Sequence, residues 1–344
     1  MPSFRVIRTA GLTVAFAAAW LGADTARSDG RAVGWGDITQ GQGPPPPLLG
    51  TVTAIAAGFY QSCAIRAATG DVVCWSTYGA APPPSLGAAS AIAAGTNDSC
   101  AIRAATGEVA CWGYYGEEAN PPPSLGAASA IAVGTSHSCA IQADTRNVVC
   151  WGNDQFGQAT PPPSLGAASA IAAGMDHSCA IQAGSGHVIC WGYDPYAAAG
   201  QATPPASVNG TEGTATAIAA GAYHSCAIQA DTGNVVCWGF NNDGQANPPA
   251  AVDGTTGTAT AIVAGYKHSC AIQAATGNVF CWGRNYYGQA NPPATLGAAS
   301  AIAAGGDHTL AIVPEPAAAL VSAVSLGSLL ALARLRGERG RSSM

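Results

Sequence analysis

All twelve cysteines of the chain fall into six pairs, and the two members of each pair are eleven residues apart. Every pair ends in the dipeptide Cys-Trp. The pairs are Cys63/Cys74, Cys100/Cys111, Cys139/Cys150, Cys179/Cys190, Cys226/Cys237 and Cys270/Cys281. A regular recurrence indicates a repeat architecture, and an even, fully paired cysteine count indicates an oxidising compartment.

The repeating unit is clearest from Ile218 to Gln245. It contains an apolar run, a variable pair, the segment HSCAIQA, a glycine-containing turn, the segment VVCWG and a polar stretch that ends in Gly-Gln. Short runs rich in Ile, Val, Cys and Trp between turns predict small sheets of three or four strands. The proline that follows Gly-Gln should shorten a fourth strand, so some sheets should have only three.

The turn between the two cysteines should fold as a β-hairpin. The hairpin places the cysteines opposite each other, with about 5.5 Å between their Cα atoms, so we expect a disulfide inside each unit. A metal site would need four converging ligands, which two cysteines across one hairpin do not supply. Arg146 stands where other units have glycine, so its turn should be slightly strained or of another type.

Half of a unit stands at each end of the repeat region. Residues 33–42 resemble the back half of a unit, and residues 302–312 resemble the front half. Leu310 and Gly34 occupy the cysteine positions, so both members of this pair are missing together. The pattern predicts an all-β fold, a seven-bladed β-propeller of three- to four-stranded blades whose seventh blade is closed by the N- and C-terminal half-repeats. An open solenoid would instead need capping repeats.

The pattern GxxHSCAI…GxVxCWGxNxxGQ resembles the repeat of the regulator of chromosome condensation family, whose members are seven-bladed β-propellers. The resemblance runs from about Val33 to Ile312 and is most specific in Ala220–Ile228 and Trp238–Gln245. WD repeats fit less well, because no Asp follows the Trp. The resemblance implies the fold and not the activity of the founding member, nucleotide exchange on the nuclear GTPase Ran. Residues 27–313 carry about nine net negative charges and one lysine, so we expect no nucleic-acid partner.

Both flanks of the propeller resemble processing segments. Residues 1–26 have basic residues followed by an apolar stretch, which is typical of a signal peptide for secretion, and the propeller would occupy residues 27–313. Residues 314–344 contain an apolar segment and a basic end, and the sorting motif consists of Val313, Pro314, Glu315 and Pro316. This tail resembles a PEP-CTERM sorting signal, which implies an exosortase-like processing enzyme as a partner.

The alternative for the tail is a plain C-terminal transmembrane helix that anchors the protein. In either case the propeller is expected at the cell surface or in the extracellular matrix of a Gram-negative-type bacterium. It would contact the membrane only transiently, through the tail, if the signal is processed.

The residues that could carry chemistry mostly have structural explanations. Five histidines share one repeat position: His137, His177, His224, His268 and His308. Gln61 and Asp98 occupy it in the first two units. Because equivalent positions on neighbouring blades should be about 10 Å apart, we expect hydrogen bonds between blades and no metal site. We likewise expect the repeat tryptophans to pack between blades, and we predict no catalytic residue and no cofactor.

All ten tyrosines fall in two loop types that should emerge at one end of the propeller, opposite the chain termini. They are Tyr60, Tyr78, Tyr114, Tyr115, Tyr193, Tyr196, Tyr223, Tyr266, Tyr286 and Tyr287. Tyrosine is enriched in binding surfaces, so we expect a monomeric, noncatalytic binding module that recognises an extracellular protein or polysaccharide through this face.

Two alternatives remain for the function. A polysaccharide-acting enzyme would need clustered carboxylates, for which the candidates are Asp154, Asp194, Glu117, Glu118 and Asp243. A purely structural component of the extracellular matrix would carry the tyrosines without any partner.

Overall fold

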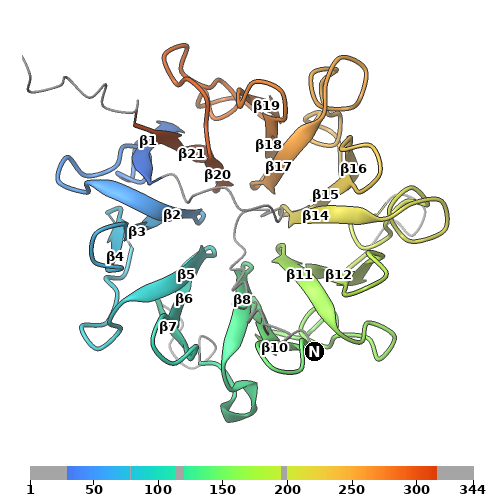
Figure 1. Ribbon diagram of the computed structural model, residues 1–344, viewed down its shortest axis with the longest axis horizontal. Helices are drawn as coiled ribbons and strands as arrows, with labels where there is room; N and C mark the ends of the chain where they lie inside the picture. Colours follow the sequence, from blue (N-terminus) through green and yellow to red (C-terminus); the bar gives the residue numbers. More distant parts are fainter. Residues whose placement is uncertain (1–28, 78, 114–119, 195–199, 316–344) are drawn as a thin grey trace, which may run out of the picture. The chain divides into compact units, whose positions relative to one another are not determined.

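The computed structural model describes residues 29–77, 79–113, 120–194 and 200–315. Within these residues the chain forms β-strands and one short 3-10 helix, Pro123–Leu125. The strands make five sheets of three strands and one sheet of six. The sheets are arranged radially, as blades around a common centre (Figure 1), where their innermost strands line a central channel. The expected all-β architecture of repeated small sheets is therefore confirmed.

Each three-stranded sheet comes from one repeat unit, and its strands are antiparallel and consecutive in the chain. The sheets are β5 (Ala89–Ala94), β6 (Asp98–Arg103) and β7 (Val109–Gly113); β8 (Ala128–Val133), β9 (His137–Gln142) and β10 (Val148–Gly152); β11 (Ala168–Ala173), β12 (His177–Gln182) and β13 (Val188–Gly192); β14 (Ala215–Ala220), β15 (His224–Gln229) and β16 (Val235–Gly239); and β17 (Ala259–Ala264), β18 (His268–Gln273) and β19 (Val279–Gly283). The first strand of each sheet lies next to the channel (Figure 1). We expected only some sheets to have three strands; among the described residues no repeat forms a fourth strand after Gly-Gln, where prolines follow.

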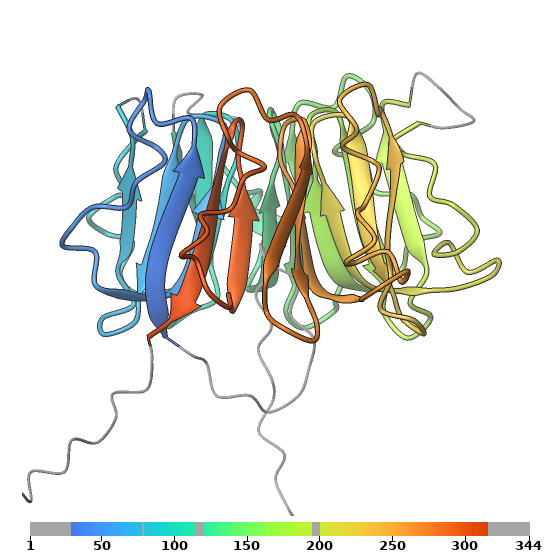
Figure 2. The same cartoon turned by 90° about the horizontal axis from the view of Figure 1, so that it is seen from above.

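The six-stranded sheet joins the two ends of the repeat region. Its order is β20 (Ala301–Ala304), β21 (His308–Pro314), β1 (Gly30–Gly36), β2 (Thr51–Ala57), β3 (Ser62–Arg66) and β4 (Val72–Trp75). β1 pairs with β21 along its whole length, from Gly30 opposite Pro314 to Gly36 opposite His308. Figure 2 shows these two strands side by side. The predicted pairing of the two terminal half-repeats is confirmed.

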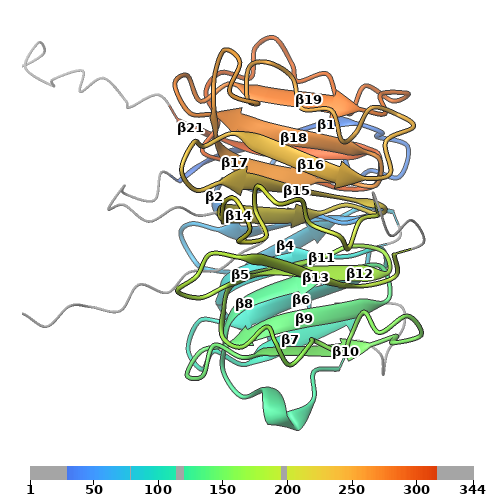
Figure 3. The ribbon, with the colours of Figure 1, turned by 90° about the vertical axis from the view of Figure 1, so that its right-hand side faces the viewer.

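The innermost strands close the ring. Each contacts the innermost strand of the next sheet, and β20 contacts β2. The link between β1 and β2 is short, with only Gly30 opposite Val52 and Arg31 opposite Thr51. The six-stranded sheet therefore consists of two sets of three strands that are joined at one corner. Figure 3 shows the successive sheets from the side.

Six disulfides join the cysteine pairs that the eleven-residue spacing predicts. In every pair the two cysteines are direct partners in the hairpin. The bridges are Cys63–Cys74, Cys100–Cys111, Cys139–Cys150, Cys179–Cys190, Cys226–Cys237 and Cys270–Cys281. The predicted connectivity within each unit is therefore confirmed.

The predicted distance between the bridged cysteines was wrong in all six units. The sequence led us to expect about 5.5 Å between Cα atoms, the spacing of a hydrogen-bonded antiparallel pair. The structure has 4.0 Å from Cys63 to Cys74, Cys100 to Cys111, Cys139 to Cys150, Cys179 to Cys190, Cys226 to Cys237 and Cys270 to Cys281. The physical reason is that the cysteines occupy the more closely spaced, non-hydrogen-bonded type of antiparallel pair.

The two cysteines of a bridge also differ in burial, which their spacing alone does not indicate. The first cysteine of every pair is fully buried in the middle strand of its three-stranded set. The second cysteine lies on the last strand, at the edge of the set, and is only partly buried. These edge residues pack against the clusters between sheets; they are Cys74, Cys111, Cys150, Cys190, Cys237 and Cys281. Each bridge therefore fastens an edge strand to the buried strand beside it.

In the split unit the two cysteine positions are again opposite each other, at Gly34 and Leu310. A Cβ atom at Gly34 would collide with the carbonyl oxygen of Gly43, in the loop that follows β1. Leu310 is fully buried beside this backbone. The loop thus takes the space that a side chain at position 34 would need, so a disulfide does not fit here.

The tryptophans pack between sheets, as expected. Trp191 belongs to the last strand of its own sheet, yet it shares a buried cluster with Cys139, Ile141 and Leu165, which precede that sheet in the chain. The other repeat tryptophans lie in corresponding clusters. Apolar contact between neighbouring sheets therefore supplies the core of the ring.

The processing segments lie largely outside the described residues. Residues 1–28 and 316–344 belong to this category, including Pro316 of the sorting motif. Val313 and Pro314 are the last residues of β21, and Glu315 follows them. In the part of the chain that is described, no helix is long and apolar enough to cross a membrane.

Candidate binding face at one end of the ring

Seven glycines surround the channel at one end of the ring. They are Gly58, Gly95, Gly134, Gly174, Gly221, Gly265 and Gly305, and each precedes the variable pair of its unit. A Cβ atom on any of them would collide with the carbonyl oxygen of the next glycine, and the last collision, from Gly305 to Gly58, completes the circle. Backbone hydrogen bonds such as Phe59 N to Gly95 O (3.0 Å) and Gly306 N to Gly58 O (3.1 Å) connect the same positions. Only glycine permits this approach between units.

The repeat histidines, three residues after these glycines in the chain, form hydrogen bonds between neighbouring units. The Nε2 atom of His177 lies 2.9 Å from Ser225 Oγ in the next unit, and Ser225 Oγ donates to the backbone carbonyl of Gln201 at 3.0 Å. The indole N–H of Trp238 donates to the same carbonyl at 3.0 Å. The contact with a Ser or Thr hydroxyl is repeated by His137, His224, His268 and His308. The expected hydrogen bonds between blades are therefore confirmed.

The geometry fixes the tautomer and charge of these histidines. Each hydroxyl uses its single proton on a Gln carbonyl, so the histidine Nε2 must donate to it. The Nδ1 atoms are buried and have no hydrogen-bond partner among the described residues. Burial lowers the histidine pKa from 6.5 to about 3 at His177 and His268, and to about 4 at His137, His224 and His308. The rings are neutral structural elements at physiological pH.

The two tyrosine-bearing loop types meet at the glycine end of the ring. Backbone hydrogen bonds join the residue after Trp-Gly to the variable pair, as from Tyr193 N to Asp176 O (2.7 Å) and from Phe240 N to Tyr223 O (2.8 Å). Gly30 and Pro314 lie at the opposite end, because the β1–β21 ladder runs from them to Gly36 and His308. The six described tyrosines share this face, whereas Tyr78, Tyr114, Tyr115 and Tyr196 lie outside the described residues.

Five of the described aromatic rings on this face contact one another in series. Phe59 contacts Tyr60 and Tyr266, with ring centroids 4.5 and 5.1 Å apart. Tyr266 contacts Tyr223 at 5.9 Å, and Tyr223 contacts Phe240 at 6.1 Å. These edge-on contacts form a continuous chain of five rings. Together with Tyr286 and Tyr287 they are called the aromatic sector below.

The split unit makes this chain possible. Phe59 and Tyr266 lie in loops on either side of the loop that contains Gly306. A Cβ atom at Gly306 would lie 3.0 Å from Cγ of Phe59, so a larger residue would displace the Phe59 ring. In three other units the corresponding position carries Thr96, Thr135 and Met175. Glycine at this position lets rings from the beginning and the end of the repeat region touch.

Two cations lie within the sector. The Lys267 ammonium is 5.5 Å from the centre of the Phe240 ring, 5.8 Å from that of Tyr266 and 3.7 Å from an Asp243 carboxylate oxygen. The guanidinium of Arg284 lies 4.8 Å from the Tyr286 ring centre, and its Nε is 3.9 Å from Asp307. The backbones of these two residues are hydrogen-bonded, with Arg284 N donating to Lys267 O at 2.8 Å.

Burial and the hydrogen bond with Tyr266 raise the pKa of Tyr223 to about 12, and the nearby negative charge of Asp176 acts in the same direction. The Tyr223 hydroxyl therefore stays protonated. Phe156 and Tyr193 form a second aromatic pair on this end of the ring, with centroids 4.6 Å apart.

The described carboxylates that were candidates for a catalytic site bind residues of the surrounding loops and do not form one cluster. Asp154 accepts hydrogen bonds from Ala159 N (2.8 Å) and Thr160 Oγ1 (2.6 Å) inside its own loop. Asp194 accepts one from Thr203 Oγ1 at 2.6 Å, and Asp243 pairs with Lys267. Glu117 and Glu118 lie outside the described residues. The three described carboxylates therefore stabilise three separate loops.

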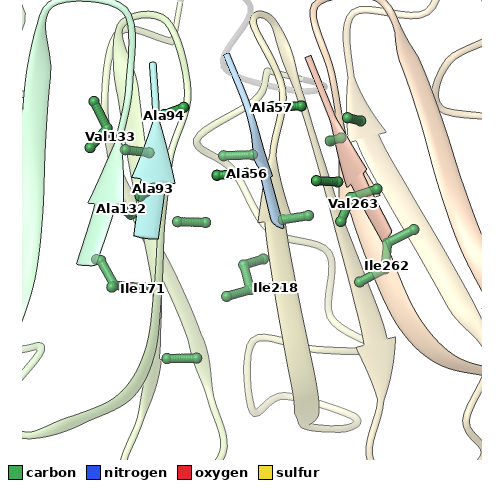
Figure 4. Close-up of a pocket in the computed structure, with 18 residues that line it drawn as sticks. Ala56, Ala57, Ala93, Ala94, Ala132, Val133, Ile171, Ile218, Ile262 and Val263 are labelled. Carbon is green, nitrogen blue, oxygen red and sulfur yellow. The ribbon is translucent and has the colours of Figure 1, made fainter. Parts of the chain in front are cut away.

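The inner part of the channel offers no polar side chain along its described lining. Its cavity of about 130 Å³ is lined by alanine, valine and isoleucine from the innermost strands, including Ile171, Ile218 and Ile262 (Figure 4). Among the described residues no group of three His, Cys, Asp or Glu side chains could hold a metal ion. The functional candidates are therefore on the outer face, around the mouth of the channel.

Similarity to known proteins agrees with this architecture. Residues 128–158, 215–245 and 259–289 match the model of the regulator of chromosome condensation (RCC1) repeat. No curated protein sequence matches the chain. The fold is similar to that of Prp20p from Saccharomyces cerevisiae, with a TM-score of 0.68 and 17% identity over 85% of this chain and 93% of that one. Prp20p has binding properties towards Gsp1p and histones.

Two plant receptor ectodomains are also similar. The entire ectodomain of the Physcomitrella patens receptor kinase CR4 has a TM-score of 0.59 and 24% identity, covering 73% of this chain and 68% of that one. The CRINKLY WD40 ectodomain of the Arabidopsis thaliana receptor kinase ACR4 has a TM-score of 0.57 and 23% identity, covering 74% and 90%. These similarities establish an RCC1-like β-propeller fold.

Proposed function

We propose that this chain is an exported, noncatalytic binding module that acts as a monomer and recognises an extracellular protein or polysaccharide through the aromatic sector. The observation that carries the proposal is the asymmetry of the face. All seven units share the channel glycine, five share the histidine and six share the disulfide. Among the described residues, in contrast, the chain of contacting rings spans only the loops of Phe240, Tyr223, Tyr266 and Phe59. Structural needs shared by all units would not produce such a difference, whereas a local binding site would.

The proposed fold is a seven-bladed propeller in which β20, β21 and β1 form the seventh blade. The long ladder between β21 and β1, the two-residue link between β1 and β2, and the closed circle of seven glycines support this division. With this division, the loops that carry Tyr223, Tyr266, Gly306 and Phe59 belong to four consecutive blades around the ring.

Export is proposed on independent grounds. Six disulfides suit an oxidising compartment, and two proteins of similar fold are receptor ectodomains. Residues 1–26 would be removed as a signal peptide, and an exosortase-like enzyme would process the tail near residues 313–316. Because Gly30 and Pro314 lie opposite the aromatic sector, a chain still held by its tail would present the sector away from the membrane.

Retention on intact cells tests the proposal. The full chain is compared with a variant that carries Tyr60→Ala, Tyr286→Ala and Tyr287→Ala, three exposed residues whose loss should leave the fold intact. We expect at least tenfold weaker retention, because exposed aromatic side chains provide much of the contact energy in binding surfaces. The matched control is Phe156→Ala with Tyr193→Ala, which removes the other aromatic pair on this end of the ring. Equal retention of all three proteins would contradict the proposal.

A further inference from the structure

The aromatic sector combines rings with two pairs of oppositely charged side chains. Lys267 is paired with Asp243, and Arg284 is paired with Asp307. Gln289 Nε2 also donates to Asp307 at 2.7 Å, which fixes the orientation of that carboxylate. The sector therefore offers both hydrogen-bond donors and acceptors, and its two cations are paired. The carboxylates of Asp37 and Asp176 also lie close to it, beside Asp307 and Tyr223.

The charge distribution argues against a polyanionic ligand. Among the described cations, Arg31, Arg66, Arg103 and Arg146 lie at or near the opposite end of the ring, at the start of β1, the ends of β3 and β6, and the hairpin turn after β9. Only Lys267 and Arg284 remain at the aromatic end of the described chain, and both have carboxylate partners. Binding of a polyanion depends on uncompensated Lys and Arg charges, which this face lacks.

The position of the ion pairs also argues against a typical protein interface. Such interfaces place apolar residues at the centre, deplete charge there and keep polar groups at the rim. Here Lys267 lies between the Phe240 and Tyr266 rings, inside the cluster. Rings and fixed polar pairs therefore alternate across the surface. A sugar chain has matching alternation, because its C–H faces pack on rings and its hydroxyls both donate and accept hydrogen bonds.

The rings that could receive such a chain are accessible. Tyr286 is 77% exposed, Tyr287 is 50% exposed and Tyr60 is 41% exposed. The guanidinium of Arg284 lies 4.8 Å from the centre of the Tyr286 ring, a cation–π contact that favours this position of the ring. A side chain that is ordered before binding loses less entropy when the ligand arrives.

We infer that the aromatic sector binds an uncharged polysaccharide, with Tyr286, Tyr287 and Tyr60 packing against sugar rings and the Lys267–Asp243 and Arg284–Asp307 pairs bonding to sugar hydroxyls. This inference rests on the proposed function of the same surface and names its ligand class.

Affinity electrophoresis of the full chain in gels that contain one polymer each tests the inference. The uncharged probes are hydroxyethylcellulose, laminarin and galactomannan, and the acidic probes are alginate and polygalacturonate. We expect at least one uncharged polymer to retard the chain, at least tenfold more strongly than either acidic polymer does. Tyr286→Ala with Tyr287→Ala should weaken that retardation at least tenfold, whereas Phe156→Ala with Tyr193→Ala should leave it unchanged.

Two variants examine the polar part of the site. Asp307→Asn keeps an acceptor but leaves Arg284 without its charged partner, and should reduce retardation by the uncharged polymer severalfold. Tyr286→Phe keeps the ring and should retain most of the binding. Circular dichroism and disulfide mapping verify that each variant is folded.

Three results would overturn the inference: no retardation by any uncharged polymer, stronger retardation by the acidic polymers, or retardation that does not depend on Tyr286 and Tyr287. These results are distinguishable from failure of the proposed function. If the three-tyrosine variant still loses retention on cells while uncharged polymers fail to bind, the binding face stands and its ligand is of another class. Loss of cell retention after protease treatment of the cells would then identify that ligand as a protein.

Discussion

Arg146 adopts the backbone conformation that glycine has at the same turn position in other units. It has a φ of +60°, and it is the non-glycine residue with positive φ among those described. The equivalent turn residues Gly70, Gly107, Gly186, Gly233 and Gly277 have φ between +72° and +76°. The hairpin therefore keeps its shape and Arg146 adopts the left-handed conformation, which confirms the expected strain.

Arg146→Gly should raise the free energy of unfolding by about 1 kcal/mol, because glycine reaches the left-handed region without steric cost. Urea unfolding of the variant and the unmodified chain measures the difference. The reverse substitution at an equivalent site, Gly233→Arg, should lower stability by a similar amount. A destabilised Arg146→Gly protein would show that the Arg146 side chain contributes more than its backbone costs.

The buried histidines make stability depend on pH. In the unfolded chain they titrate near pH 6.5, whereas in the folded protein their pKa lies at about 3 or 4. Between these values the unfolded state binds more protons, so their contribution is complete above about pH 6.5 and is lost as the pH falls towards 4. Acidification should therefore destabilise the ring well before the folded histidines are protonated.

His177→Gln should reduce the slope of unfolding free energy against pH near pH 5 by about 1.4 kcal/mol per pH unit, the value for one proton. Gln61 occupies this position in the first unit, so the fold accepts a buried glutamine there, although the Gln61 amide has no hydrogen-bond partner among the described residues. Urea titrations between pH 4.5 and 7.5 measure the slope. His187→Gln, outside this set, is the control for loss of a histidine. An unchanged slope in His177→Gln would mean that His177 is charged in the folded state.

At the scale of the elements, the channel-facing glycines decide how closely the sheets approach. The contact between one glycine and the next carbonyl recurs around the whole channel. Side chains of the innermost strands are correspondingly small, mostly alanine. The ring is thus built from close backbone packing at its centre, and from tryptophans and disulfides farther out.

Gly221→Ala should lower the free energy of unfolding by at least about 3 kcal/mol, because the new methyl group would strike both the His224 ring and the Gly265 carbonyl. Gly244→Ala is the matched control. Gly244 has positive φ (+79°) but no atom within 4 Å of an added Cβ, so it should cost only about 1 kcal/mol. Similar losses in the two variants, measured by urea unfolding, would remove the role assigned to the glycine contacts.

Much of the element level was predictable from sequence, and the reasons are local. The spacing of Cys226 and Cys237 around one turn determines their hairpin, and the Pro residues after Gly-Gln prevent another strand. The spacing does not reveal which type of antiparallel pair the cysteines occupy, so their Cα distance was overestimated. The sequence explains only in part why glycine stands at position 34. The absence of both cysteines in the split unit is visible in the sequence, but its cause, the carbonyl of Gly43, appears only when the loop after β1 is placed in space.

At the scale of the whole molecule, closure of the ring by its terminal strands brings the residues of the aromatic sector together. Pairing of β1 with β21 brings the Gly306 loop beside Phe59, so Phe59 can reach Tyr266 although the two are distant in the chain. The sequence predicted that the tyrosines share one end of the ring. It could not predict that Phe59, Tyr266 and Tyr223 contact one another, or that Lys267 lies between two of the rings, because these depend on side-chain packing across units.

The most direct measurement is oxidative footprinting of the full chain, free and bound to the intact cells that retain it, with peptide mass spectrometry. Binding should protect Tyr60, Tyr286 and Tyr287 from oxidation, and should leave Phe156, Tyr193 and, at the opposite end of the ring, the exposed Leu48 as reactive as in the free protein. Protection of Leu48, or equal protection around the rim without preference for the aromatic sector, would contradict the account.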